Sequence, residues 1–253
     1  MKRFRAARVL AVLALLAASF GCRSGAKDDP ILRLSAAESL AEGKQLFERE
    51  KYAAARPYFA HAFEVEPNSA AGREALLLVA DTLFLEGSDT DLIQAEAKYR
   101  DFQNRFPTSE RSDYVQYQIA RSLARRIERA DRDQAATVKA LQAFEDLLRL
   151  YPTSPHAEEA RAEIATVRDR LAEHEYVVGQ FYLRYGLHKA AIARLNTLLE
   201  RYPGYGERDK ALWALGMSHA GAKAADDAQA TFSKLRDEFP QSRWLAKVPK
   251  EYR

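Results

Sequence analysis

The feature that most constrains the fold of this chain is a short proline motif that recurs along its length. The five copies are Glu66-Pro67-Asn68-Ser69, Phe106-Pro107-Thr108-Ser109, Tyr151-Pro152-Thr153-Ser154, Tyr202-Pro203-Gly204-Tyr205 and Phe239-Pro240-Gln241-Ser242. Twelve residues before each proline stands an alanine: Ala55, Ala95, Ala140, Ala191 and Ala228. Eight residues before it stands a large apolar or aromatic residue: Phe59, Tyr99, Phe144, Leu195 and Phe232. Such constant spacing predicts a structure built from repeated units.

Each of these positions has a mechanical role in a pair of packed helices. The alanine of the second helix lets the first helix approach closely, and the large residue four positions later fills the seam on the same face. The proline ends the second helix because the residue before a proline disfavours helical backbone. Twenty-four residues before the proline, three copies have Gly43, Gly179 and Gly216, and the other two have Leu83 and Glu128. The pattern resembles the tetratricopeptide repeat, so we predict an all-α solenoid of about five helical-hairpin repeats.

The widest gap between the motif prolines is 51 residues, and it contains one continuous apolar stripe. The stripe has intervals of three and four residues: Ala157, Ala160, Ile164, Val167 and Leu171. This periodicity predicts a single long helix from about Pro155 to Tyr185. The helix would join three N-terminal repeats, in residues 35–154, to two C-terminal repeats, in residues 155–250.

Two local features need their own interpretation. Pro57 lies inside the expected second helix of the first repeat, where a proline removes a hydrogen bond and crowds the preceding turn. Either that helix begins late, near Ala55, or it is kinked. The segments 89–91 and 129–133 have the composition of turns, and we expect them to connect helices within the second and third repeats.

The N-terminus has the composition of an export signal. The first eight residues carry Lys2, Arg3, Arg5 and Arg8 and no acid. An apolar run follows over residues 9–20, which is shorter than the ~20 residues that a membrane-spanning helix needs. We therefore expect residues 1–21 to be a signal peptide that is removed on export.

Cys22 follows the apolar run directly and is the only cysteine in the chain. A lone cysteine cannot form an internal disulfide, and its position resembles the bacterial lipobox, in which the cysteine is acylated and becomes the mature N-terminus. Many such lipoproteins stay in the inner membrane when Asp follows the cysteine; here Arg23 follows, so the resemblance implies the outer membrane. Residues 22–34 would form the acylated N-terminus and a flexible spacer. The alternative is ordinary cleavage near Ser19, which would leave Cys22 as a free thiol.

Removal of the signal changes the net charge. The whole chain has 39 basic and 36 acidic residues and a net charge of +3. Without the four cations of the signal, 35 basic residues face 36 acidic ones, which gives a net charge of −1. A nearly neutral protein has no global basic field, so nucleic acid is not an expected partner.

The chain does not contain the residue patterns of common catalytic or metal sites. His174-Glu175 resembles the start of the zinc-binding HExxH motif, but Val178 occupies the position of the second histidine. The five histidines are dispersed, and neither a glycine-rich phosphate loop nor a GxSxG nucleophile elbow occurs. We therefore expect no catalytic residues, no metal and no cofactor, and a protein that acts by binding.

Two aromatic residues are candidates for binding. Phe47 and Phe84 fall at or near first-helix positions that line the concave groove of such solenoids, and an extended peptide fits a groove of this kind. The alternative for both rings is packing in the core. A run of arginines, Arg125, Arg126, Arg129 and Arg132, is either a solvated face or a surface that docks a partner.

Longer stretches of the chain carry a more specific resemblance. They are Ser112-Asp113-Tyr114-Val115-Gln116-Tyr117, Arg168-Asp169-Arg170-Leu171-Ala172-Glu173, and the region from Tyr185-Gly186 to Arg201-Tyr202-Pro203. Together with the length, the lipobox and the five repeats, they make the chain resemble the BamD family of the outer-membrane β-barrel assembly machinery. Arg194 stands nine residues before Pro203, and the resemblance implies that an arginine at this position helps to bind the barrel-forming subunit.

The resemblance implies a non-catalytic scaffold on the periplasmic face of the outer membrane of a Gram-negative bacterium. The N-terminal repeats would receive unfolded outer-membrane proteins, and the C-terminal repeats would dock the periplasmic domains of the barrel-forming subunit. Other assembly lipoproteins and the membrane itself, reached through the lipid, would be further partners. Two rival functions stay open: a periplasmic repeat scaffold for envelope or peptidoglycan enzymes, and an envelope hydrolase whose site is not recognised.

Overall fold

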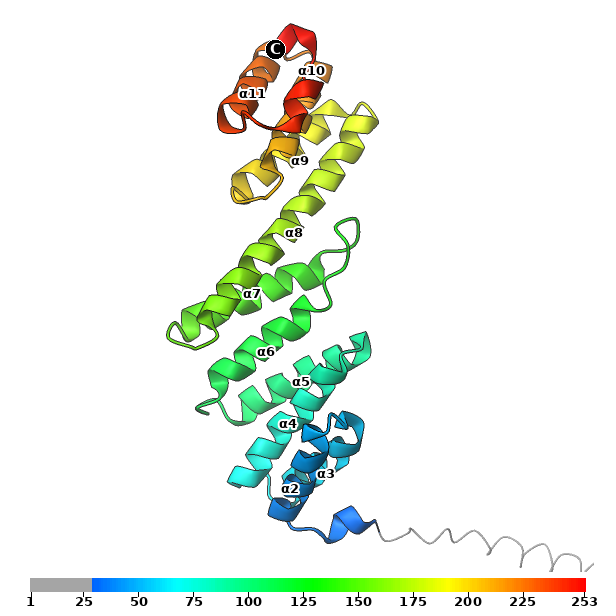
Figure 1. Cartoon of the computed structure of the whole chain (residues 1–253), viewed down its shortest axis with the longest axis vertical. Helices are drawn as coiled ribbons and strands as arrows, with labels where there is room; N and C mark the ends of the chain where they lie inside the picture. The colour runs from blue at the N-terminus through cyan, green and yellow to red at the C-terminus, as the bar shows by residue number, and fades with distance from the viewer. Residues whose placement is uncertain (1–28) are drawn as a thin grey trace, which may run out of the picture.

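The computed structural model describes residues 29–253, and this part of the chain is helical with no β-strand (Figure 1). A 3-10 turn, η1 (Pro30–Arg33), precedes the α-helices of this range. These are α2 (Ala36–Glu48), α3 (Tyr52–Val65), α4 (Ala70–Glu86), α5 (Asp89–Arg105), α6 (Ser112–Ala124), α7 (Ala135–Leu150), α8 (Ala157–Arg184), α9 (His188–Arg201), α10 (Arg208–Gly221) and α11 (Ala225–Glu238). Two 3-10 turns, η2 (Arg243–Lys247) and η3 (Lys250–Tyr252), complete the described chain.

The helices stack in the order of the sequence. Each helix packs mainly on the one before and the one after it, from α2 on α3 to α10 on α11. Figure 1 shows the result as an elongated stack, with the blue N-terminal helices at one end and the red C-terminal helices at the other. Contacts limited to neighbours are the defining property of a solenoid, so the predicted all-α repeat architecture is confirmed.

The residues that define the repeat motif form the centre of each helix pair. All five alanines and all five large residues of the motif are fully buried. The glycines explain why the first helix needs a small residue. A Cβ atom would lie 2.6 Å from the Phe59 ring at Gly43, 2.5 Å from the Phe232 ring at Gly216 and 2.9 Å from Leu195 at Gly179. These distances are too short for a normal contact, so glycine permits the close approach of the two helices.

Helix α8 is the long helix predicted from the apolar stripe, and it has 28 residues. It packs on both α7 and α9. The hydrophobic core divides along it: Ala160, Ile164 and Val167 belong to the N-terminal cluster, whereas Ala172 and Tyr176 belong to a C-terminal one. One continuous helix therefore connects two separately packed groups of helices.

Pro57 does not delay the start of its helix. Helix α3 begins at Tyr52, and the backbone N–H of Ala55 already donates to the Lys51 carbonyl at 2.9 Å. Pro57 stands within the helix, so the alternative of a late start near Ala55 is wrong. The seam formed by the buried residues Ala55 and Phe59 extends across this proline.

The prediction of a turn at 89–91 is also wrong, because these residues form the first turn of α5. Ser88 caps the helix by accepting a hydrogen bond from the Asp91 N–H at 3.1 Å. Asp89 and Asp91 suit the positive end of the helix dipole there. The chain turns instead at Gly87, whose φ of 71° is readily adopted by glycine. The prediction for 129–133 is confirmed, since these residues lie between α6 and α7.

Candidate partner-binding surfaces

Arg194 lies on α9 and faces the side of α8. Its guanidinium forms a salt bridge with Glu175 at 3.2 Å. The arginine side chain is 45% exposed, whereas Glu175 is only 15% exposed. Because a guanidinium has five N–H donors in a fixed fork, the pairing with Glu175 leaves donors of Arg194 free to face solvent. Arg194 is thus held in place and still accessible.

Phe47 lies near the end of α2 and is partly buried against the N-terminal core. Its ring makes edge-to-face contacts with Tyr52, at 5.3 Å between centroids, and with Phe59, at 6.2 Å. Both contacts come from α3. The ring therefore supports the first helix pair in addition to any contact that it makes with a ligand.

Phe84 lies on α4 and is buried, with 4% of its surface exposed. Two guanidinium groups from α6 and its end lie over the ring, Arg121 at 4.8 Å and Arg125 at 4.9 Å. Arg125 also donates to the Phe84 carbonyl at 2.7 Å. The accessible group at this place is consequently Arg125, which is exposed. The sequence suggested the aromatic ring but not the arginines that cover it.

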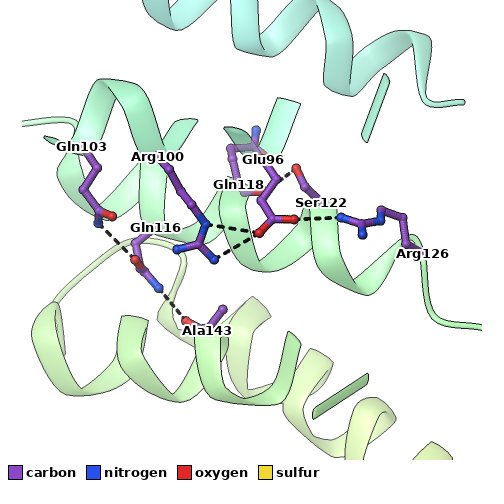
Figure 2. Close-up of polar contacts among 8 residues, drawn as sticks. All are labelled: Glu96, Arg100, Gln103, Gln116, Gln118, Ser122, Arg126 and Ala143. Atoms are coloured by element: carbon purple, nitrogen blue, oxygen red, sulfur yellow. Dashed lines mark hydrogen bonds and ion pairs between the residues drawn. The ribbon is translucent and has the colours of Figure 1, made fainter. Parts of the chain in front are cut away.

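The run of arginines after α6 does not form one surface. Arg125 lies over Phe84, while Arg126 turns toward α5 and pairs with Glu96 at 2.7 Å. Glu96 also pairs with Arg100 at 3.1 Å, so that one carboxylate holds two guanidinium groups (Figure 2). Arg129 is 86% exposed and pairs with Asp131 in the loop. Arg125 and Arg126 therefore bond to other helices, whereas Arg129 and Arg132 lie in the exposed loop.

Two further hydrogen bonds in Figure 2 link three consecutive helices through Gln116. Gln103 of α5 donates to the side-chain oxygen of Gln116 on α6 at 3.1 Å. Gln116 in turn donates to the carbonyl of Ala143 on α7 at 2.9 Å. Gln116 is itself buried, so these bonds satisfy polar groups that would otherwise lose their partners in the core.

A third polar cluster centres on Asp81 of α4. The hydroxyls of Tyr99 and Tyr114 both donate to one oxygen of its carboxylate, at 2.6 Å and 2.8 Å. Burial raises the pKa of Asp81, and the two tyrosine hydroxyls and Arg111 oppose that rise. Gln118 donates to the Tyr114 hydroxyl at 2.8 Å. The cluster joins α4, α5 and α6 at one point.

The end of α8 exposes aromatic side chains that the sequence did not identify as a candidate surface. Phe181 and Tyr185 are 53% and 65% exposed, and their ring centroids are 4.7 Å apart. Leu187, just beyond the helix, is 52% exposed. Contiguous exposed apolar groups are a common mark of protein contact sites. None of these three residues stands at a position of the repeat motif, and this is the feature by which the sequence could have pointed to them.

A cleft of about 720 Å³ lies beside the middle of α8, next to the loop that leads into α10. The loop is tied to α8 because the Gly206 N–H donates to Asp169 at 2.8 Å and Tyr205 donates to Glu173. Lys210 pairs with Glu173 at 3.3 Å and lies 4.1 Å above the Tyr176 ring. Burial is the main reason that the pKa of Tyr176 rises to about 12. These contacts fix the C-terminal helices to the long helix.

The remaining predictions concern the N-terminal anchor, membrane-spanning helices and metal sites. Cys22, the signal peptide of residues 1–21 and most of the spacer lie outside the described residues. Within residues 29–253, no helix is both long and apolar enough to cross a membrane. The same residues bring together no group of three or more His, Cys, Asp or Glu side chains that could hold a metal ion.

Comparison with known proteins gives one consistent result. Residues 34–231 match the family model YfiO, described as an outer membrane lipoprotein. A protein of Caulobacter vibrioides named outer membrane protein assembly factor BamD is 27% identical over 242 residues, which cover 95% of this chain and 78% of that protein. The protein of the same name from Rickettsia prowazekii is 28% identical over 226 residues and 89% of this chain, covering 88% of its own length. The resemblance to the BamD family is thereby confirmed.

Solved structures with similar helical arrangements include two tetratricopeptide proteins. The TPR2AB domain of yeast Sti1, in a complex with pHSP90, is 14% identical over 83% of this chain and 80% of its own, with a TM-score of 0.44. A thermophilic tetratricopeptide protein of Thermus thermophilus is 21% identical over 84% of this chain and 95% of its own, with a TM-score of 0.37.

Proposed function

Because the chain belongs to the YfiO family of outer membrane lipoproteins, we propose that it is a scaffold of the β-barrel assembly machinery. In this role it helps to fold and insert outer-membrane β-barrel proteins by binding the client and the barrel-forming subunit. The observation that carries the proposal is the similarity to assembly factors along nearly the whole chain, at 95% and 89% coverage. The protein acts without catalysis, and its helical surface supplies the binding groups.

The proposed attachment is a lipid on Cys22. Export removes residues 1–21, acylation of Cys22 anchors the protein on the periplasmic face of the outer membrane, and residues 22–34 form the spacer. Several acyl chains hold a protein on a membrane firmly, whereas a single chain binds only marginally. A spacer of this length spans at most ~45 Å when extended, so the N-terminal helices stay close to the membrane.

The two halves of the solenoid bind different partners. Residues 35–154 receive the unfolded client, with Phe47 as a candidate contact in the groove and with Arg125 as the accessible group over the buried Phe84 ring. Residues 155–250 bind the periplasmic domains of the barrel-forming subunit through Arg194. The salt bridge to Glu175 supports this assignment, because it orients the guanidinium while nearly half of the side chain remains exposed. Other lipoproteins of the machinery are further partners.

Depletion of the protein in its own cell tests the function. We expect β-barrel proteins to disappear from the outer membrane, as measured by quantitative proteomics of the isolated membrane. A scaffold for envelope enzymes would instead give wall or septation defects with intact barrel proteins. Turnover of a wall substrate by the purified protein would favour a hydrolase. Affinity purification from detergent-solubilised membranes supplies the second measurement, since the barrel-forming subunit should be recovered with the protein.

A further inference from the structure

A cleft of about 650 Å³ lies between the start of α4, the end of α5 and the loop before α6. Leu77, Phe102 and Phe106 line it with apolar groups, and the first two are buried. Arg73, Arg105 and Arg111 line it with guanidinium groups, and all three are exposed. Two carboxylates, Glu74 and Glu110, line it as well, so the cleft combines an apolar surface with a charged one in which three arginines face two glutamates. It involves neither Arg194 nor the candidate residues Phe47 and Phe84.

Each of the three guanidinium groups lies over an aromatic ring. Arg73 is 5.9 Å from the centroid of Phe106, Arg105 is 5.4 Å from that of Phe63, and Arg111 is 4.6 Å from that of Tyr114. A ring face attracts a cation and limits its movement, and the N–H groups at the guanidinium edge stay available for hydrogen bonds. The three cations are thus partly oriented before any ligand arrives.

The charges of the cleft are only partly balanced from within the protein. Arg105 pairs with Asp101 at 2.8 Å, and Glu74 of the cleft pairs with Lys44 outside it at 2.7 Å. Among residues 29–253, no carboxylate forms a salt bridge with Arg73 or with Arg111. Arg111 acts on the partly buried Asp81 only at longer range, and that carboxylate already accepts two tyrosine hydroxyls. Glu110, the other carboxylate of the lining, forms no salt bridge within residues 29–253, and Arg73 donates one hydrogen bond to the Asn68 carbonyl at 3.0 Å. Two oriented guanidinium groups are consequently not paired directly with a carboxylate.

We propose that this cleft binds an acidic, extended peptide segment of another protein, in which carboxylates flank an apolar or aromatic side chain. The carboxylates would accept hydrogen bonds from Arg73 and Arg111, because the guanidinium fork matches the geometry of a carboxylate. The apolar side chain would lie against Leu77, Phe102 and Phe106. The inference goes beyond the assembly role and does not depend on it, since the charge and shape of the cleft alone carry it.

The test uses the lipoprotein purified in detergent and a fluorescein-labelled peptide of alternating Asp and Phe. Fluorescence anisotropy should report binding that weakens as salt is added, because salt screens exposed charges. A matched peptide with Asn in place of Asp should bind at least about tenfold more weakly, which corresponds to about 1.4 kcal/mol. Equal binding of the two peptides would overturn the proposal.

Variants of the cleft locate the binding. Arg73→Gln combined with Arg111→Gln should weaken binding of the Asp peptide by about tenfold, while Arg149→Gln, a similarly exposed arginine on α7, should leave it unchanged. Arg73→Gln alone, at an exposed position, serves if the double variant does not fold by circular dichroism. Unchanged binding by a folded cleft variant would refute the site. Binding of phosphatidylglycerol vesicles or inorganic phosphate in place of the peptide would refute the class of ligand.

Discussion

Ser154 donates its hydroxyl to the carboxylate of Asp113 at 2.7 Å and so ties the loop after α7 to the second residue of α6. Ser242 makes the equivalent bond to Asp209, the second residue of α10, at 2.5 Å. Both serines belong to the recurring proline motif. In these two helix pairs the motif serine therefore bonds back to the start of its own pair.

Breaking this bond should destabilise the protein locally. Ser154→Ala is expected to lower the free energy of unfolding by about 1–2 kcal/mol, since it removes a hydrogen bond to a charged group. Urea titration followed by circular dichroism measures the change. Thr153→Ala, at the exposed neighbouring position, is the control and should have almost no effect. A double-mutant cycle with Asp113→Ala should show coupling, and purely additive losses would mean that the bond contributes nothing.

The sequence predicted the buried seam of each helix pair well because that seam depends on steric rules that act at fixed spacing. In three of the five pairs a glycine of the first helix lies against the large motif residue of the second, so Gly43 with Phe59 could be read from the pattern. The cap at Ser88 was missed because the acidic residues after it have the composition of a turn as well as of a helix start. Composition alone does not distinguish the two.

Contacts between distant helices could not be predicted in the same way. Arg121 and Arg125 cover Phe84 from a helix about 40 residues further along the chain, and no spacing rule reports such a contact. The two hydrogen bonds that Asp81 accepts likewise come from tyrosines on two other helices. Candidate binding residues are therefore less predictable than core residues, because the packing of the helices determines which partners a long side chain can reach.

The contact between Gly43 and Phe59 predicts a specific packing defect. Gly43→Ala would place a Cβ atom 2.6 Å from the ring, so the ring or the helix must shift. Overpacking of this kind costs about 1–3 kcal/mol, measurable as a lower midpoint in thermal unfolding. Gly204→Ala is the control, because no atom lies within 4 Å of the added carbon.

A compensating change tests the cause of that defect. The fourth helix pair has Gly179 beside Leu195, a smaller partner than phenylalanine. A Cβ at Gly179 would still lie 2.9 Å from Leu195, but leucine lacks the ring atoms Cε1 and Cζ, which at Phe59 lie 2.6 Å and 3.2 Å from the carbon added at Gly43. Phe59→Leu added to Gly43→Ala should therefore recover part of the lost stability. If the loss of stability in the double variant exceeds the sum of the losses in the two single variants, steric conflict is not the reason for glycine at this position.

Asp81 predicts a pH dependence of stability. Its pKa in the folded protein is raised above the ordinary value of 3.8, so the folded state binds the proton more tightly than the unfolded state. Stability contributed by this group is therefore present below about pH 4 and is lost as the pH rises through the folded pKa. Asp81→Asn, which can still accept from both tyrosines, should remove this component. Relative to the wild type, the variant should gain stability between about pH 4 and pH 7.

Urea unfolding at several pH values checks this expectation. Asp237→Asn, at an exposed position of α11, controls for the loss of one negative charge. A constant difference between Asp81→Asn and the wild type across the whole range would show that the carboxyl group does not titrate differently in the folded and unfolded chain.

The proposed anchor predicts the location of a variant without the lipid. Cys22→Ser in a precursor that is still processed should give a periplasmic protein that stays in the soluble fraction. The reason is the net charge of the processed chain, −1, which offers no general electrostatic attraction to an anionic membrane. Fractionation has to be done in cells that lack the partner subunits. Recovery of the variant with membranes under that condition would contradict lipid anchoring.

Arg194 predicts a loss of partner binding without a loss of stability. The pair with Glu175 is partly exposed, and exposed pairs contribute about 0–1 kcal/mol, so Arg194→Ala should leave the unfolding midpoint almost unchanged. Arg194→Glu reverses the charge offered to the partner, and pull-down of the barrel-forming subunit should fall by about tenfold or more, because like charges at an interface are costly. Arg201→Glu, an exposed arginine on the same helix, makes the same change in net charge and should bind normally. Arg194→Lys should bind with intermediate strength, since lysine keeps the charge but loses the guanidinium fork. If the wild type, Arg194→Glu, Arg201→Glu and Arg194→Lys all capture the subunit equally, Arg194 does not belong to the docking site. The fold and the family assignment would stay intact.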